Sequence, residues 1–508
     1  MEKSQTIGAG NDRPASELEK DIESKPTTTR AEYIDDPDDG LSEEERAKID
    51  RKLLWRLDLM LIPWLCLLYL ASFLDRTNIG NAKLDGLEKD LHMSGQQYNL
   101  TLTIFFISYS VFEPLTNVLL KKLRPSVFLP IIMFLWGICM ITMGLVHNFS
   151  GLMAARWFLG LTEAGLFPGI GYYLSCWYKR SEFGVRMAIF FSAAALAGSF
   201  GGLLAAAIGE MDGIGGKPGW AWIFIIEGLA TIVIGALSFW MVHDFPDEAK
   251  FLSDADKKRV LRRLAADKQS SAEHEEFKMA YFWASVKDWK TYTGAMIYMG
   301  ADMPLYAFSL FTPTIIEELV RYSSIKAQLL SVPPYAAAAI VTISIGLIAD
   351  RTRQRGLCNI CISIVGIVGF AMLLGAETAG TRYAGVFLGA MGIYPCISNT
   401  IAWASNNTEG VYKRGVTIGM IIGWGNLNGV VSSNIYRNQD SPRFYPGHGV
   451  VMGYLVVFLF GGSILQEILL RIENRKRRRG DRDHWIEGLA PHEIELLGDK
   501  RPDFIYTL

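Results

Sequence analysis

Four charged residues that lie within long apolar stretches are the part of this sequence best suited to chemistry. Asp75 and Arg76 are neighbours in one such stretch, and Arg156 and Glu163 share another. An arginine stays protonated, and its planar guanidinium can pair with a carboxylate through two hydrogen bonds. A carboxylate that is buried away from water can instead take up a proton near neutral pH. Together, the four residues suit a site that binds an organic anion and exchanges protons.

The spacing of these residues allows two interpretations of how they pair. Glu163 follows Arg156 by seven residues, so the two lie on one face of a helix, two turns apart. At a rise of about 1.5 Å per residue, Arg156 lies about 9 Å inside its apolar stretch, and Asp75 and Arg76 lie at a similar depth. Either all four residues share one cavity, or Asp75–Arg76 and Arg156–Glu163 are two structural ion pairs that neutralise each other.

The elements that carry these charges are long enough to cross a lipid bilayer. A spanning helix needs roughly 18 or more apolar residues, and only a helix satisfies its own backbone in lipid. The sequence therefore predicts an all-α membrane protein with twelve transmembrane helices in two six-helix halves, which is typical of carriers. The predicted spans are 57–82, 96–120, 125–147, 150–178, 184–209, 218–242, 291–315, 326–349, 357–375, 382–404, 414–436 and 448–471.

Polar segments divide the chain into five parts. Lysine and arginine gather in alternate short loops, so the positive-inside rule places both termini and the central linker in the cytoplasm. The expected parts are a disordered tail at 1–50, a six-helix half at 51–243, a linker at 244–290, a second six-helix half at 291–472 and a cytoplasmic tail at 473–508.

Composition argues against several other classes of protein. Half of the 508 residues are hydrophobic and 20% are charged, against about 25% charged in soluble domains. The net charge of −2 gives no basic face for nucleic acid. The seven histidines lack metal-ligand spacing, and no glycine-rich loop follows a strand. We expect no enzyme activity, no cofactor and no metal, with the bilayer, a small organic anion and protons as the partners of a functional monomer.

Other polar residues within the predicted spans leave their roles open. Asn399 and Asn426 either donate to a ligand or form hydrogen bonds between helices. Glu113 and Glu227 suit packing or an interhelical hydrogen bond as well as they suit transport chemistry. Asp302 either lines a cavity or pairs at a helix break.

Residues 346–356 carry a resemblance to a known family. This segment resembles the G-x-x-x-D-R-x-x-x-R loop of the major facilitator superfamily, with Gly346, Asp350, Arg351 and Arg355 at its fixed positions. The resemblance implies that Asp350 meets a helix N-terminus of the opposite half and helps to hold one conformation. The corresponding loop of the first half has Lys121 in place of the aspartate, so this latch is expected to be one-sided.

Motifs in the first half resemble a particular branch of that superfamily. They are similar to the anion:cation symporters, within these to the fungal allantoate permease group, and most of all to high-affinity nicotinate permeases. The resemblance covers about residues 50–475. The motifs are LDRTNIGNA at 74–82, SYSVFEP at 108–114, RWFLGLTEAGLFPG at 156–169, WYKR at 177–180 and FIIEG at 224–228.

The resemblance implies roles for individual residues. Arg76 would contact the substrate carboxylate, Asp75 and Glu163 would take coupling protons, and Arg156 would tune Glu163. Both halves would contribute polar and aromatic walls, and the substrate-binding candidates are Arg76, Arg156, Asn399, Asn426, Tyr172 and Trp403.

The resulting prediction is proton-coupled uptake of a small organic carboxylate, nicotinate or a similar anion, by alternating access at the plasma membrane. The alternatives are an exporter of an acidic metabolite and a nutrient sensor that keeps the fold without transporting.

Overall fold

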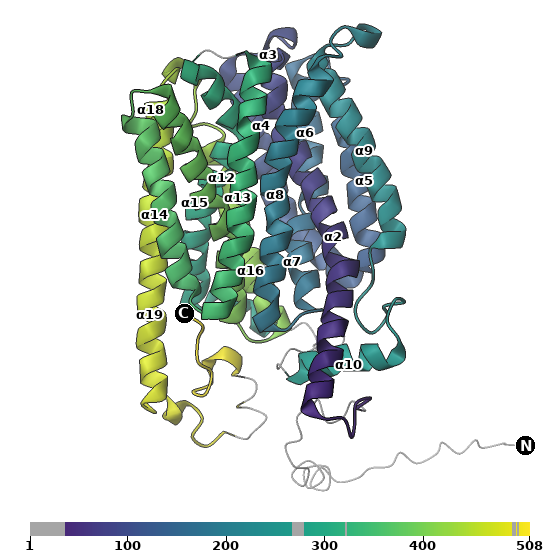
Figure 1. Cartoon of the computed structure of the whole chain (residues 1–508), viewed down its shortest axis with the longest axis vertical. Helices are drawn as coiled ribbons and strands as arrows, with labels where there is room; N and C mark the ends of the chain where they lie inside the picture. Colours follow the sequence, from purple (N-terminus) through teal and green to yellow (C-terminus); the bar gives the residue numbers. More distant parts are fainter. Residues whose placement is uncertain (1–35, 267–278, 321–322, 490–493, 495–496) are drawn as a thin grey trace, which may run out of the picture.

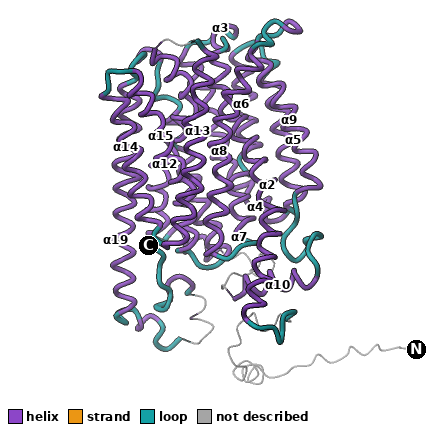
Figure 2. Tube along the Cα trace, viewed as in Figure 1, coloured by secondary structure: helices purple, strands orange, loops and turns teal. Residues whose placement is uncertain are grey.

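The computed structural model describes residues 36–266, 279–320, 323–489, 494 and 497–508. Within these residues the chain is helical and contains no strand (Figure 2). Residues 1–35 of the predicted disordered tail, and 267–278 of the predicted linker, lie outside the described residues. Residues 43–50 of that tail belong to the first helix. The helix begins with a capping box, in which the side chains of Ser42 and Glu45 each accept from the backbone N–H of the other residue.

The helices of the first half agree in place with the first six predicted spans. They are α2 (Glu43–Leu84), α3 (Leu87–Asp90), α4 (Gly95–Lys122), α5 (Pro125–Met143), α6 (Phe149–Glu163), α7 (Leu166–Ser175), α8 (Arg180–Gly209) and α9 (Gly219–Met241). The predicted single span 150–178 is broken between α6 and α7, directly after Glu163. At this break Gly165 lies so close to Thr116 and Phe128 that a Cβ would lie 2.9 Å from the threonine side chain.

The linker and the second half follow in the same way. Their helices are α10 (Asp254–Ala266), α11 (Met279–Val286), α12 (Trp289–Val320), α13 (Ser324–Thr352), α14 (Arg355–Gly375), α15 (Ala379–Asn406), α16 (Val411–Leu427), α17 (Gly429–Ser432), α18 (Tyr445–Gly453), the π-helical segment η4 (Tyr454–Gly461) and α19 (Gly462–Arg478). The predicted span 414–436 is divided into α16 and α17, and the last three segments run on as one helix.

The helices of the first half and those of the second half stand side by side, with α8 and α13 adjacent at their boundary (Figure 1). Contacts of α2 with α12 and of α4 with α16 join the same two halves. Among the described residues, eight helices are long and apolar enough to cross a membrane. The helices α4 and α12 and the interrupted pairs α6–α7 and α16–α17 stand at the other four predicted positions. The predicted all-α membrane fold is confirmed, and the order of the helices is consistent with the predicted two six-helix halves.

Candidate functional site

Arg76 lies where α2 of the first half contacts α12 of the second. Its guanidinium is buried and paired with Glu163 of α6, whose Oε1 accepts from Nη2 at 2.7 Å and from Nε at 3.1 Å. Ser72, one turn before Arg76 on α2, donates to the same oxygen at 2.5 Å. The second oxygen of Glu163 has no hydrogen-bond partner. One oxygen of this buried carboxylate thus accepts from the cation, while the other accepts no hydrogen bond.

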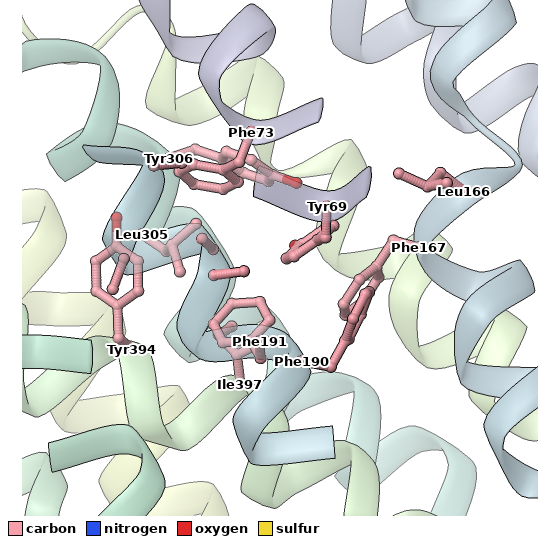
Figure 3. Close-up of a cluster of buried hydrophobic side chains, with 14 of the residues drawn as sticks. Tyr69, Phe73, Leu166, Phe167, Phe190, Phe191, Leu305, Tyr306, Tyr394 and Ile397 are labelled. Atoms are coloured by element: carbon pink, nitrogen blue, oxygen red, sulfur yellow. The ribbon is translucent and has the colours of Figure 1, made fainter. Parts of the chain in front are cut away.

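Aromatic rings enclose this ion pair and exclude water from it. The Arg76 Cζ lies 4.9 Å from the ring centre of Tyr109, 5.3 Å from that of Phe105 and 5.5 Å from that of Tyr306. Such distances allow cation–π attraction, which is stronger when the cation is desolvated. Next to it lies the cluster drawn in Figure 3, in which Tyr69 packs against Phe190 with ring centres 4.6 Å apart.

A chain of hydrogen bonds joins Arg76 to the second half and returns to the first. Arg76 Nη1 donates to the Tyr306 hydroxyl at 2.5 Å, and this hydroxyl donates to Asn426 Oδ1 at 3.0 Å. The Asn426 amide then donates to Glu113 Oε2 at 3.1 Å. Because Tyr306 lies on α12, Asn426 on α16 and Glu113 on α4, the chain crosses the boundary between the halves twice.

Asp75 points away from Arg76 and into the first half. Its Oδ2 accepts from Trp136 Nε1 at 2.9 Å and from Thr231 Oγ1 at 2.8 Å, while Oδ1 has no hydrogen-bond partner. One turn further along α2, Asn78 donates to Glu227 of α9. These two carboxylates therefore have only neutral donors as hydrogen-bond partners.

The interpretation with ion pairs Asp75–Arg76 and Arg156–Glu163 is wrong in its pairing. Adjacent residues on a helix do not face each other, so Asp75 and Arg76 point to different neighbours. Two turns of helix also separate Arg156 from Glu163 by about 10 Å, which favours contacts with other helices. Arg76 pairs with Glu163 instead, across α2 and α6.

Arg156 also lies over the Phe105 ring, with its Cζ 5.1 Å from the ring centre. The side chain is buried, and its Nε donates weakly to the Thr101 carbonyl at 3.4 Å. Its Nη1 has no hydrogen-bond partner. Arg156 is thus a second buried cation beside the Arg76 pair, close enough to act on Glu163 electrostatically.

The structure places the other three predicted binding residues away from Arg76. Asn399 donates to the Arg355 carbonyl and to Asn359 Oδ1, both at 2.8 Å, and the Trp403 indole donates to the Thr507 carbonyl at 3.0 Å. Tyr172 lines a small cavity between α7 and α16. Of the two asparagines left open by the sequence, Asn426 joins the Arg76 network and Asn399 bonds between helices α14 and α15.

The predicted latch residues meet at the boundary between the halves. Asp350, near the end of α13, accepts from the backbone N–H of Val185 at 2.8 Å, near the start of α8, and is also paired with Arg355. A Cβ at Gly346 would collide with Ala188 of α8, so the absence of a side chain permits this close approach. Arg351 is exposed.

Several partners of the site were not found from the sequence. Ser72 lies four residues before Arg76, on the same helical face, and this spacing was the available signal. Trp136 and Thr231 resemble ordinary packing residues in apolar helices and gave no signal. Among the described residues, no group of three or more His, Cys, Asp and Glu is placed to hold a metal ion.

Comparisons with known proteins agree with this architecture. The model of the Major Facilitator Superfamily matches residues 65–433. The MFS transporter prlL of Fungal sp. (strain NRRL 50135) is 36% identical over 474 residues, which cover 90% of this chain and 93% of the relative. The high-affinity nicotinic acid transporter of Saccharomyces cerevisiae is 32% identical over 494 residues, covering 97% of this chain and 90% of the relative.

Two solved structures share the fold. A bacterial homologue of the human lysosomal transporter Spinster, inward-facing and unoccupied, superposes with a TM-score of 0.58 at 14% identity, covering 81% of this chain and 94% of that one. The human organic anion transporter TETRAN superposes with a TM-score of 0.55 at 12% identity, covering 79% of this chain and 99% of that one. At these identities the likeness concerns the fold alone.

Proposed function

Because the chain belongs to the Major Facilitator Superfamily of membrane transporters, we propose that it is a secondary active transporter that carries a small organic carboxylate together with protons. The observation that carries this proposal is the buried Arg76–Glu163 pair at the boundary between the halves. A buried charge in a membrane protein is costly and needs a partner or a function. Here the same cation is within reach of both halves, through Glu163 on one side and Tyr306 on the other.

The ion pair offers a direct way to couple substrate and proton. A substrate carboxylate that binds Arg76 replaces Glu163 as the partner of the cation. The released Glu163, still buried beside Ser72, is then best accommodated when it is neutral, since an unpaired buried carboxylate is strongly disfavoured. Substrate binding therefore draws a proton onto Glu163. When the substrate leaves, Arg76 recaptures the carboxylate and the proton is released.

Asp75 supplies a second proton-binding group in this scheme. Its hydrogen-bond partners Trp136 and Thr231 are neutral, so no hydrogen-bonded cation holds it in the charged form. A monoanion that moves with one proton carries no net charge, and each pH unit then supplies about 1.36 kcal/mol. With two protons the cycle moves one positive charge and gains about 2.3 kcal/mol per 100 mV in addition.

Nicotinate is the proposed substrate, supported by the full-length likeness to a high-affinity nicotinic acid transporter. We also propose that the protein acts as a monomer in the plasma membrane. The lysines and arginines of alternate loops favour a cytoplasmic position for both termini. We also propose that the chain has the five parts predicted from its sequence, and that the latch is formed by the Asp350 loop of the second half without a counterpart in the first. In it, Asn399 and Trp403 support the cytoplasmic end of the second half instead of binding substrate.

Uptake of labelled nicotinate into proteoliposomes tests the function. We expect uptake to rise with an inward proton gradient and to collapse when a protonophore is added. If two protons move, an inside-negative potential increases it further. Uptake that ignores both the pH gradient and the protonophore would refute proton coupling and leave a uniporter. Absence of any nicotinate uptake, with exchange of other carboxylates intact, would change the substrate and keep the transport class.

A further inference from the structure

Two buried carboxylates outside the Arg76–Glu163 pair come from opposite halves of the molecule. Glu113 belongs to α4 and Asp302 to α12, and their exposed fractions are 1% and 2%. Each carboxylate keeps one oxygen without a hydrogen-bond partner, Oε1 of Glu113 and Oδ2 of Asp302. A buried oxygen of this kind is costly unless it binds something.

Both carboxylates lie against the same turn of α16. Asn426 donates to Glu113 Oε2 at 3.1 Å, and a Cβ placed at Gly423 would lie 3.8 Å from that oxygen. A Cβ at Gly425 would lie 3.1 Å from Asp302 Oδ2, the oxygen without a partner. Asp302 also acts electrostatically on Glu113. The two acids therefore share one environment, which α16 closes.

Among the residues that the structure describes, Arg76 is the cation that acts on both acids, and it is already engaged by Glu163. The titratable and charged groups around the pair are Arg76 and Tyr69 on α2, Tyr109 on α4, Glu163 on α6, and Tyr298 and Tyr306 on α12. The described part of α16 beside Asn426 adds no charged residue.

We propose that Glu113 and Asp302 form a proton site that is complete only when the two halves close upon each other. Two ionised carboxylates brought together in a medium of low dielectric repel each other strongly, so closure requires at least one of them to be protonated. Opening toward water separates and hydrates the two groups, and the proton is released. The conformational change itself thus binds and releases one proton.

This inference rests on the proposed proton-coupled transport and adds a site that needs no substrate. It can therefore be tested on the purified protein without any transported molecule. Spin labels would be attached to cysteines at Lys89 and Gln439, two exposed positions of opposite halves, in a background without the native cysteines. A second labelled pair at the exposed Arg124 and Arg353 reports the other end of the molecule. Pulsed electron resonance gives the distance distribution of each pair.

We expect the population with both pairs at their short distance to shrink at least threefold as the pH rises from about 5 to about 9. Glu113→Gln and Asp302→Asn should each abolish this transition or move it upward by at least one pH unit, because a neutral amide imitates the one protonated acid that closure requires. The double variant should stay closed throughout. Glu467→Gln is the matched control, since Glu467 is a buried carboxylate of α19 that is paired with Arg471. It should titrate like the background.

Three outcomes would overturn the inference: a background without any pH response, a double variant that opens with the background transition, or a control that loses the transition as well. Failure of nicotinate uptake with the pH response intact would affect the substrate assignment and leave the proton site standing. A lost pH response with gradient-driven uptake intact would refute the proton site and leave the proposed transport function standing.

Discussion

Replacing Glu163 with glutamine separates the charge of this residue from its shape. In the structure its Oε1 accepts two hydrogen bonds from Arg76 and one from Ser72. The amide of Glu163→Gln can still accept from these donors, but it leaves the buried guanidinium without a counter-charge. Removing one partner of a buried ion pair costs ~3–5 kcal/mol, so we expect the ligand-free variant to be less stable than the wild type by an amount of this order.

The same substitution should tighten the binding of a carboxylate. In the wild type, a ligand that reaches Arg76 must first displace Glu163, and a hydrogen bond to a charged group has a net value of about 1.5–3 kcal/mol. With the competitor neutralised, affinity for nicotinate should rise by roughly 10- to 100-fold, at about 1.4 kcal/mol for each tenfold step. A bound carboxylate should also restore most of the lost thermal stability.

Proton uptake distinguishes this reasoning from a general loosening of the site. Calorimetric titration of nicotinate in two buffers of different ionisation enthalpy gives the number of protons bound with the ligand. We expect about one proton for the wild type and about none for Glu163→Gln, by the linkage between ligand and proton. In proteoliposomes the variant should exchange substrate without accumulating it against a gradient.

The control for this experiment is Glu467→Gln, which removes a buried carboxylate at a distance from Arg76 and should bind nicotinate like the wild type. Weaker binding by Glu163→Gln, or an unchanged proton uptake, would refute displacement of Glu163 as the coupling step. The first outcome would mean that Glu163 assists the ligand, and the second that Asp75 or another acid takes the proton.

Three further predictions concern the anchor, the latch and the C-terminal tail. Arg76→Lys keeps the charge and loses the planar fork, so the apparent affinity for nicotinate should fall at least tenfold in protein that reaches the membrane normally; unchanged affinity would move the anchor to Arg156. Asp350→Asn removes the charge that holds the start of α8, so labelling of cysteines placed at the contact between α8 and α13 should become faster. Unchanged labelling would show that the latch contributes little. Asp499→Asn should lower the free energy of unfolding at neutral pH by ~3–5 kcal/mol, because this buried residue pairs with two buried lysines. The control Asp503→Asn, on the same segment, should leave the free energy of unfolding unchanged. Burial alone would raise the pKa of Asp499, but these lysines hold it below the usual value; the stabilisation is therefore present above about pH 4 and is lost as the pH falls through the lowered pKa.

The fold could be predicted from the sequence because the bilayer restricts each spanning segment to a helical backbone. Each predicted span coincides with a helix or with two consecutive helices, since a long apolar segment in lipid has no other backbone solution. This restriction does not predict where a spanning helix is interrupted. The break after Glu163 and the division of the segment around Asn428 depend on how closely neighbouring helices approach, and the local composition does not contain that information.

The candidate site could be predicted from the sequence only in part. Burial within an apolar helix singled out Arg76 and Glu163, but the partner of each charge depends on the rotation and depth of helices that are far apart in the sequence. Asn399 illustrates the limit, because it has the same chemical character as Asn426 and lies in a similar span. One bonds to Arg355 and Asn359 and the other to Tyr306 and Glu113, and only the tertiary arrangement distinguishes them.

The balance of buried charge gives an argument for proton coupling that does not depend on any single pairing. Within the described residues, the central parts of the spanning helices bury two arginines and five carboxylates: Arg76, Arg156, Asp75, Glu113, Glu163, Glu227 and Asp302. A substrate carboxylate adds one more negative charge to this environment. Because an unpaired carboxylate is strongly disfavoured where the dielectric is low, the occluded complex is accommodated best when protons neutralise several of these acids. Arginine keeps its own proton, so the number of protons carried is set by the carboxylates, and neutralising them one at a time by Asp→Asn and Glu→Gln substitution should reduce the protons bound per substrate at those positions that take part in the cycle.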